Sequence, residues 1–294
     1  QIAEETKRYW NDTFTDKETG ITKNADGSTC DVQGSYSIGL NCDVFADAVK
    51  EKAFAHLERT TREGNYTIQS GFFGTGPINP MLSKGGYPEA AQKTITQTAF
   101  PSWLYPVTQG ATTIWERWNS VLDDGHLSGT MMNSLNHYAY GSIGSWLYEK
   151  VAGIRCMEPG YKKIRIQPTL TKGMTEVSAA YESIYGTIVS AWSCREGKIC
   201  VDVQIPANTT AVIQLPEKEA EFTVGSGRYH YEYKTDTNLK FEKYSLESTL
   251  GELVAEELGR NMFEEMMPGM LEDPLIQFAL SMTISDLLVQ DAQA

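Results

Sequence analysis

The first half of the chain carries apolar residues at helical spacing. In residues 37–57 (SIGLNCDVFADAVKEKAFAHL) they recur every three or four positions, as on one face of an amphipathic helix. Pro88 begins a second predicted helix, residues 88–100, since the first helical position needs no backbone N–H. Residues 1 to about 155 are therefore predicted to be helices joined by long loops.

Residues 134–154 (SLNHYAYGSIGSWLYEKVAGI) are small and apolar on almost every side. A helix that is apolar all round is normally buried. Its alternating alanine, glycine and serine residues would let neighbouring helices approach closely. This segment is therefore expected to lie inside a large helical assembly.

Beyond about residue 158 the apolar residues alternate, as in β-strands. The alternating runs are residues 162–168 (KKIRIQP), 176–183 (EVSAAYES), 186–195 (GTIVSAWSCR), 198–206 (KICVDVQIP) and 209–216 (TTAVIQLP). Residues 219–235 add a predicted hairpin with GSG as its turn, in which Tyr229, Tyr231 and Tyr233 share one face. Short strands at this spacing indicate an antiparallel β-sandwich.

From Ser248 the chain returns to helical spacing and is acidic. Thr249 and Glu252 have the T-x-x-E spacing of a capping box, and a second short helix is predicted through residues 284–288. The five methionines of this region are expected to fill a small core. The alternative is that they cover a partner surface.

Three loops between the predicted helices are rich in glycine and in aromatic or histidine residues. They are residues 70–80 (SGFFGTGPINP), 99–119 and 123–137 (DDGHLSGTMMNSLNH). Functional residues concentrate on loops that a rigid scaffold holds in place. These three segments are therefore the first candidates for a site.

Composition narrows the classes of partner. The formal net charge of the 294 residues is −13, which argues against a nucleic-acid backbone. No apolar run reaches the roughly 18 residues of a membrane span. The chain shows no signal peptide, so a cytoplasmic location is expected. Its five cysteines are scattered without a CxxC pair and are expected to be reduced, buried thiols rather than zinc ligands.

One acidic residue lies within an aromatic stretch. Residues 110–119 (GATTIWERWN) place Glu116 between Trp115 and Trp118. An apolar surround makes ionisation of a carboxyl group costly, so such an acid needs a partner or a function. The residues alone leave open a second reading, in which Glu116 begins a helix in solvent. They also leave open whether Arg117 orients Glu116 or pairs with another acid.

Five sequence blocks occur in the order and spacing of a known family. They are GATTIWERWN, NSLNHYAYGSIGSWLYEKVAGI, PGYKKIRIQP, YESIYGTIVSAW and VQIPANTTAVIQLP. Together they resemble the bacterial α-L-rhamnosidases of glycoside hydrolase family 78, over roughly residues 30–216. Five ordered blocks are far more specific than one short motif.

The resemblance implies an (α/α)6 barrel followed by a C-terminal β-sandwich, an α+β multidomain fold that agrees with the change of periodicity. Residues 1–157 are then the C-terminal half of the barrel, residues 158–237 the sandwich and residues 238–294 an acidic helical extension. Twelve barrel helices need more residues than the first region provides. We therefore expect a C-terminal portion of a larger enzyme, whose missing N-terminal portion or another chain covers the open barrel face.

The resemblance also implies an inverting hydrolase that removes terminal α-L-rhamnose. Inverting hydrolysis uses two carboxyl groups about 6.5–9.5 Å apart, one as general acid and one as general base. Glu116 matches the base of the family, and the acid is expected on the upstream portion. His137 matches a histidine that contacts rhamnose, and Trp103, Trp115 and Trp118 are predicted to wall the sugar pocket.

Two other functions fit the same residues. The chain could be a non-catalytic carbohydrate-binding or assembly module, or a six-hairpin glycosidase for another sugar. The predicted ligand is a rhamnose-containing glycoside. No cofactor, metal, nucleic acid or membrane is predicted as a partner.

Overall fold

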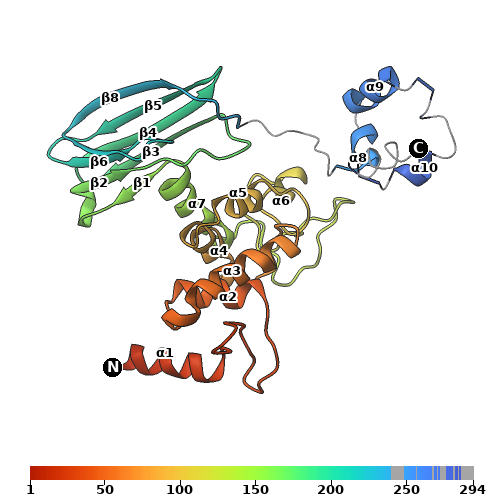
Figure 1. Ribbon diagram of the computed structural model, residues 1–294, viewed down its shortest axis with the longest axis horizontal. Coiled ribbons are helices and arrows are strands. Elements are labelled where there is room, and N and C mark those ends of the chain that lie inside the picture. Colours follow the sequence, from red (N-terminus) through yellow and green to blue (C-terminus); the bar gives the residue numbers. More distant parts are fainter. Residues whose placement is uncertain are drawn as a thin grey trace. The chain divides into compact units, whose positions relative to one another are not determined.

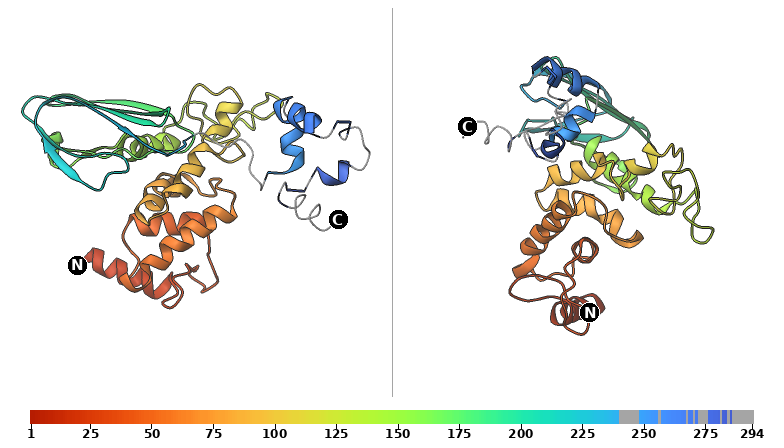
Figure 2. Two further views of the ribbon diagram at one scale, coloured as in Figure 1. Left: turned by 45° about the horizontal axis from the view of Figure 1, so that its top comes forward. Right: turned by 90° about the vertical axis from the view of Figure 1, so that its right-hand side faces the viewer.

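The structure of the protein, a computed structural model, describes residues 1–239, 248–255, 257–266, 268–269, 271, 276–280, 282–283 and 285. These residues belong to two compact units, 1–239 and 240–294, which are described separately. The first unit contains a helical region and then a β-sandwich (Figures 1 and 2). The second contains short helices.

The helical region holds one compact core. Its elements are α1 (Ile2–Thr13), α2 (Gln33–Asn41), α3 (Asp47–Glu63), α4 (Phe72–Lys84), α5 (Pro88–Thr96), α6 (Leu104–Thr108), η1 (Ala139–Ser142), α7 (Ile143–Trp146) and η2 (Leu147–Val151). Helices α2 to α5 pack against one another, and between them Tyr36, Leu57, Ile78 and Leu82 are completely buried. The predicted start of a helix at Pro88 is confirmed, although this helix ends before residue 100.

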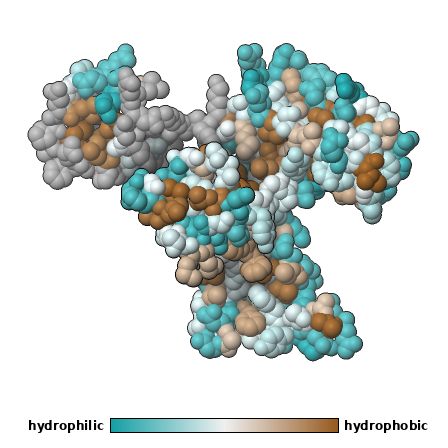
Figure 3. Space-filling model, turned by 180° about the vertical axis from the view of Figure 1, so that it is seen from behind, coloured by the Kyte–Doolittle hydropathy of each residue, from teal (hydrophilic) through white to brown (hydrophobic). Residues whose placement is uncertain are grey.

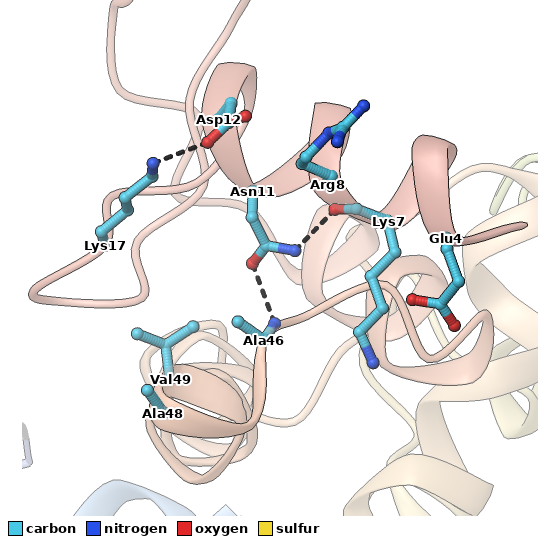
Figure 4. A pocket seen from close by; sticks show the side chains of 9 residues that line it. All are labelled: Glu4, Lys7, Arg8, Asn11, Asp12, Lys17, Ala46, Ala48 and Val49. Carbon is cyan, nitrogen blue, oxygen red and sulfur yellow. Dashed lines mark hydrogen bonds and ion pairs between the residues drawn. The ribbon is translucent and has the colours of Figure 1, made fainter. Parts of the chain in front are cut away.

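The helix predicted over residues 37–57 is in fact two helices, α2 and α3. Asp43 between them has a positive φ of 54°, which is outside helical geometry. The Asn11 side chain accepts a hydrogen bond of 2.8 Å from the Ala46 N–H, just before α3 (Figure 4). Phe45 is completely buried, so the break places a large aromatic ring in the core.

The prediction of a loop over residues 70–80 is also wrong, because most of these residues lie in α4. Pro77 and Pro80 are inside this helix, and each removes a backbone hydrogen bond. Contacts with α5 offset the loss of these two backbone hydrogen bonds. Asn79 is completely buried and its side-chain amide donates to the Ala91 carbonyl oxygen of α5 at 2.7 Å.

Residues 134–154 are helical only over η1, α7 and η2, and they are buried on one side. Ile143, Trp146 and Val151 are in the core, whereas Ser145 and Tyr148 are exposed. The prediction that residues 134–154 are buried on every side is therefore wrong. Gly141, Ser142 and Ser145 lie on the open side together with Tyr148 and Glu149.

The sandwich consists of two four-stranded sheets. Its elements are β1 (Ile154–Cys156), η3 (Pro159–Tyr161), β2 (Lys163–Ile166), β3 (Glu176–Ser183), β4 (Gly186–Arg195), β5 (Lys198–Ile205), β6 (Thr210–Gln214), β7 (Glu221–Val224) and β8 (Gly227–Lys234). The strand orders are β1-β2-β6-β7 and β3-β4-β5-β8. Neighbouring strands are antiparallel except β2 and β6, which are parallel. Ile164, Ile166, Ile188, Ile199 and Ile213 are completely buried in the core.

The five alternating runs become β2 to β6, as predicted. The hairpin over residues 219–235 is wrong, because β7 pairs with β6 while β8 pairs with β5 in the other sheet. Tyr229, Tyr231 and Tyr233 do share one half-buried face of β8. Strand β1 was not predicted, and the domain boundaries at residues 157 and 237 stay predictions.

Hydrogen bonds connect the helical region to the sandwich within the first unit. The Trp192 indole N–H of β4 donates to the Val151 carbonyl oxygen at 2.8 Å, and the Ser190 hydroxyl donates to the Ala152 carbonyl oxygen at 2.6 Å. All four residues are buried. The end of η2 is therefore held against the inner face of β4.

The second unit contains α8 (Leu250–Ala255), α9 (Glu257–Met266) and α10 (Ile276–Ala279). Leu250 and Ile276 are buried, but Met262 is 50 % exposed, so it does not fill a core as expected. The side chains of Met266, Met267, Met270 and Glu252, and most of the helix predicted through residues 284–288, lie outside the described residues.

Two further expectations concern cysteines and membranes. All five cysteines are free. Cys194 is buried, but Cys42 and Cys156 are exposed, so burial was wrongly expected for these two. Across the part of the chain that the structure describes, no helix has the length and apolar character needed to cross a membrane.

Candidate active site

Two short segments bring the predicted base and the predicted histidine onto neighbouring stretches of backbone. Residues 113–116 and 134–137, called the paired segments below, run side by side. The Glu116 N–H donates to the Ser134 carbonyl oxygen at 2.8 Å. The His137 N–H donates to the Ile114 carbonyl oxygen, also at 2.8 Å. Residues that are 21 positions apart in sequence are thus held in one local structure.

Glu116 as a residue is half-buried, and its carboxylate is oriented by the same pairing. Its Oε2 atom accepts a hydrogen bond of 2.7 Å from the Ser134 N–H. Among the residues that the structure describes, no donor contacts Oε1. A charge-assisted bond to a backbone N–H fixes a carboxylate in one direction, and the second oxygen remains open to a water molecule.

Arg117 does not pair with Glu116 in this structure. Its guanidinium is exposed and donates to the Met131 carbonyl oxygen at 3.0 Å. This contact holds the loop between the paired segments. The alternative in which Arg117 orients the neighbouring acid is therefore not supported by the contacts it makes.

A continuous series of aromatic contacts, called the ring chain below, connects three of the predicted residues. Trp103 meets Trp118 edge to face at 5.6 Å between ring centroids, and Trp118 stacks on Tyr140 at 3.8 Å with 11° between the planes. Phe72 of α4 contacts Tyr140 at 5.2 Å and the His137 ring at 4.9 Å. The ring chain thus joins His137 to both tryptophans.

The three predicted tryptophans are all buried, with 6–8 % of each residue exposed. The Trp103 indole N–H donates to the Tyr140 carbonyl oxygen at 3.1 Å, so this polar group is occupied. Trp115 lies outside the ring chain. Because most of each indole packs against protein, only a small part of each is available to a ligand in this structure.

The contacts of His137 select one neutral form of its ring. Its Nδ1 atom accepts a hydrogen bond of 3.2 Å from the Ala139 N–H at the start of η1. An atom that accepts from an N–H carries no proton, so the proton of the neutral ring is on Nε2. Phe72 and Tyr138 stack on the ring at 4.9 and 5.2 Å. The imidazole is therefore fixed and presents Nε2–H as a donor.

Tyr140 is a site residue that the sequence interpretation missed. It is buried at the centre of the ring chain, and burial, together with the negative charge of Glu116, raises the pKa of Tyr140. Its hydroxyl group is therefore electrostatically coupled to the predicted base. The only signal in the sequence was its position three residues after His137.

The helical region also contains a separate cleft. A cleft of about 460 Å³ between α1 and the start of α3 is lined by Glu4, Lys7, Arg8, Asn11, Asp12, Lys17, Ala46, Ala48 and Val49 (Figure 4). It contains none of the predicted site residues. Within the described residues, no three histidine, cysteine or acidic side chains gather in a way that could hold a metal ion.

A helical region with a candidate site on its loops, followed by a two-sheet sandwich, is consistent with a six-hairpin glycosidase domain and its C-terminal domain. The family model for the bacterial alpha-L-rhamnosidase 6 hairpin glycosidase domain matches residues 1–151. The model for the bacterial alpha-L-rhamnosidase C-terminal domain matches residues 153–230. The chain belongs to the bacterial α-L-rhamnosidase family.

Curated relatives are similar over about two thirds of the chain. It is 38 % identical over 189 residues to an alpha-L-rhamnosidase of Formosa agariphila and 36 % identical over 186 residues to one of Streptomyces avermitilis. These matches cover 64 % and 63 % of the chain but 20 % and 18 % of the relatives. The chain thus spans about a fifth of the length of these relatives.

Solved structures give the same picture. The Streptomyces avermitilis alpha-L-rhamnosidase complexed with L-rhamnose is similar with a TM-score of 0.72 and 30 % identity, over 79 % of this chain and 24 % of that chain. The native alpha-L-rhamnosidase from Aspergillus terreus is similar with a TM-score of 0.72 and 31 % identity. That match covers 78 % of this chain and 26 % of the Aspergillus chain. The similarity extends over both the helical region and the sandwich.

Proposed function

We propose that this chain supplies the general base and part of the sugar pocket of an enzyme that removes terminal α-L-rhamnose with inversion. The observation that carries this proposal is the Glu116 carboxylate, fixed through one oxygen and open at the other, on the segment paired with His137. A relative with 30 % identity was solved in complex with L-rhamnose, which supports the choice of sugar.

The proposed reaction needs two proton transfers. Glu116 accepts a proton from a water molecule while the water oxygen attacks the anomeric carbon from the face opposite the leaving group. A carboxylic acid on a segment outside this chain gives its proton to the leaving oxygen. The glycosidic bond breaks, one water molecule is consumed, and the sugar is released as the β-anomer.

The other site residues bind the sugar in this proposal. His137 donates from Nε2 to a hydroxyl group of rhamnose, because Nδ1 is already occupied by the Ala139 N–H. Rhamnose has a methyl group and C–H faces, which favour contact with the accessible parts of Trp103, Trp115 and Trp118. The same aromatic groups keep competing water away from the carboxylate.

The general base is tested in the complete enzyme that contains this chain. Glu116→Gln keeps the size of the side chain but cannot accept the proton, so kcat on an aryl α-L-rhamnoside should fall by about 10²–10⁴ while KM changes little. Glu89→Gln, an exposed position on α5, is the matched control and should leave kcat unchanged. Full activity of Glu116→Gln would remove the assignment.

The stereochemistry and the location of the acid are tested separately. Proton NMR should show the β-anomer of rhamnose as the first product, and an α-anomer would contradict inversion. Azide should partly restore turnover of Glu116→Ala and yield a β-rhamnosyl azide, because a small anion needs no general base. Strong turnover by this chain alone would contradict an acid outside it.

The rest of the catalytic domain is the proposed partner of the helical region. Helix α1 has no buried residue, and Ile2 is 81 % exposed. Next to the ring chain, Phe73 and Tyr138 are 89 % and 88 % exposed, and apolar residues reach the surface in several places (Figure 3). In this proposal the rest of the catalytic domain covers these apolar residues.

Co-expression tests this partner. The upstream portion of the enzyme and this chain, made as separate polypeptides, should purify as a 1:1 complex with rhamnosidase activity, and the complex should bind less of a hydrophobic dye than this chain alone. The assembly alternative would give a complex without activity. Two polypeptides that remain separate would contradict the proposed interface.

A further inference from the structure

A hollow of about 480 Å³ lies beside the tryptophan end of the ring chain. Tyr105 follows Trp103 by two positions, and Asn119 comes directly after Trp118. The volume is within the range of about 300–1,000 Å³ that small-molecule sites occupy. The lining residues, none of which belongs to the ring chain or the paired segments, form what is called the Phe100 hollow below: Phe100, Tyr105, Asn119, Leu122, Asp123 and Asp124.

One wall of the Phe100 hollow is aromatic and fixed in position. Phe100 is 51 % exposed, and its ring meets the Tyr105 ring edge to face at 5.4 Å between centroids, with 72° between the planes. Ser102 is completely buried, and its hydroxyl group accepts a hydrogen bond of 3.2 Å from the Tyr105 N–H. The Ile68 N–H donates to the Pro101 carbonyl oxygen at 2.8 Å. The Phe100 ring therefore offers an accessible apolar face on an anchored backbone, which reduces the ordering cost of binding.

Other lining residues are polar and keep part of their hydrogen-bonding capacity free. The Tyr105 hydroxyl donates to Oδ1 of Asp123 at 2.9 Å. Within the residues that the structure describes, no donor contacts Oδ2 of Asp123, and the half-buried Asn119 side chain makes no hydrogen bond. A carboxylate accepts from hydroxyl groups, and an amide both donates and accepts. This pair therefore matches the hydroxyl groups of a ligand.

The charge of the Phe100 hollow selects among ligands that carry hydroxyl groups. Of its six lining residues, only Asp123 and Asp124 are charged, and Oδ1 of Asp124 already accepts from the His126 N–H at 3.0 Å. An acidic ligand would meet like charge with no lining cation to offset it, so a neutral ligand is favoured. A metal ion is a poorer match, since no three metal-ligating side chains gather anywhere in the described part of the chain.

The Phe100 hollow is also close to the proposed general base. Asn119 is three positions from Glu116, and three residues of chain span at most about 11 Å. A substrate that extends one sugar ring beyond the bond to be cleaved therefore reaches both places. In an enzyme that removes terminal rhamnose, any further sugar of the substrate belongs to the leaving group.

We propose that the Phe100 hollow binds a neutral sugar ring in the leaving group of the glycoside. The C–H face of this ring packs on Phe100, while its hydroxyl groups donate to Asp123 and bond with the Asn119 amide. This inference rests on the proposed function, because it assumes that rhamnose occupies the neighbouring site. The residues that recognise the leaving group are then separate from those that act on the rhamnose.

The test compares substrates that differ only in the leaving group, in the complete enzyme that contains this chain. Asp123→Ala removes a hydroxyl acceptor, so kcat/KM on α-L-rhamnosyl-D-glucose should fall by about tenfold. On an aryl α-L-rhamnoside, whose leaving group has no sugar hydroxyl groups, kcat/KM should be unchanged. Asp236→Ala, at an exposed position after β8, is the matched control and should change neither value.

The charge selection is tested with α-L-rhamnosyl-D-glucuronic acid. Asp123→Asn keeps the shape of the side chain but removes its charge, so it should raise kcat/KM for this acidic substrate relative to α-L-rhamnosyl-D-glucose. An unchanged ratio would contradict the selection by charge. Equal losses on the aryl and disaccharide substrates with Asp123→Ala, or no loss on either, would overturn the proposed sugar site while leaving the general base intact.

Failure of the proposed function would give a different result, in which the complete enzyme cleaves no rhamnoside. Saturation-transfer NMR with this chain and methyl β-D-glucopyranoside then still tests the Phe100 hollow. Wild type should transfer saturation to the sugar protons, and Phe100→Ala should lose most of the signal. Phe222→Ala, at a partly exposed phenylalanine of β7, is the control and should keep it. Equal signals from wild type and Phe100→Ala, or none from wild type, would overturn the inference.

Discussion

The sandwich and the helical region differ in how far each completes its own core. In the sandwich, isoleucines from both sheets are completely buried between them. In the helical region, α1 buries no residue, and two aromatic residues beside the ring chain are almost fully exposed. Burial of apolar area is the main source of stability. The core of the sandwich is therefore the more complete of the two, whereas the candidate site lies on the region that leaves more apolar residues exposed.

The largest effect is expected in the sandwich. Trp192 is 2 % exposed and its indole N–H is bonded to Val151. Trp192→Ala should lower the free energy of unfolding of this chain by about 3–5 kcal/mol, because it leaves a cavity and an unpaired carbonyl group. Urea unfolding followed by circular dichroism measures the change. A loss below about 1 kcal/mol would contradict this packing of β4 against the end of η2.

An intermediate, pH-dependent effect is expected in the helical region. Burial acts to raise the pKa of Asp31, but hydrogen bonds from Tyr36 and Arg59 outweigh it and hold the pKa of Asp31 below its usual value. Asp31→Asn should therefore cost about 1 kcal/mol at neutral pH. A lowered pKa contributes stability above the unfolded value of about 3.9, and this contribution is lost as the pH falls through the folded value.

Unfolding of wild type and Asp31→Asn between pH 7 and pH 3 checks that sign. The difference in Tm should stay constant down to about pH 5 and shrink below about pH 4. Glu51→Gln is the control, since Glu51 is exposed on α3 and its side chain makes no hydrogen bond or ion pair within the described residues. A difference that grows on acidification would contradict the role of the contact between Asp31 and Arg59, which is 2.7 Å long.

The smallest effect is expected on α1. Tyr9 is 61 % exposed, so Tyr9→Ala should change the stability of this chain by less than about 0.5 kcal/mol. In the complete enzyme the same substitution should cost clearly more, because we propose that other helices cover this face. The measurement is the shift in Tm caused by Tyr9→Ala, in this chain alone and in the complete enzyme. Equal shifts would show that α1 has no partner.

The sequence predicted those parts of the fold that depend on local pattern. Alternating apolar residues identified β2 to β6, and Pro88 marked the start of α5. Errors arose where distant contacts decide the outcome. Residues 70–80 have the prolines of a loop but form a helix because Asn79 and its neighbours pack against α5. Strands β7 and β8 are adjacent in sequence, yet each pairs with a strand of a different sheet.

The candidate site was predictable to a similar degree. The sequence indicated Glu116, His137 and the three tryptophans, and the structure places Glu116 and His137 on the paired segments; their catalytic roles stay predictions. Phe72 and Tyr140 were missed because an aromatic residue near a helix is indistinguishable in sequence from ordinary core.

The paired segments also bear on how such an enzyme can diversify. Glu116 and Ser134 share two hydrogen bonds, so the intervening chain leaves and returns at one fixed point. The tip of that excursion, residues 122–126, is a small turn closed by a hydrogen bond of 2.8 Å. A longer or different tip could be grafted there while the carboxylate keeps its orientation, so evolution or an engineer could change the loop without rebuilding the proposed general base.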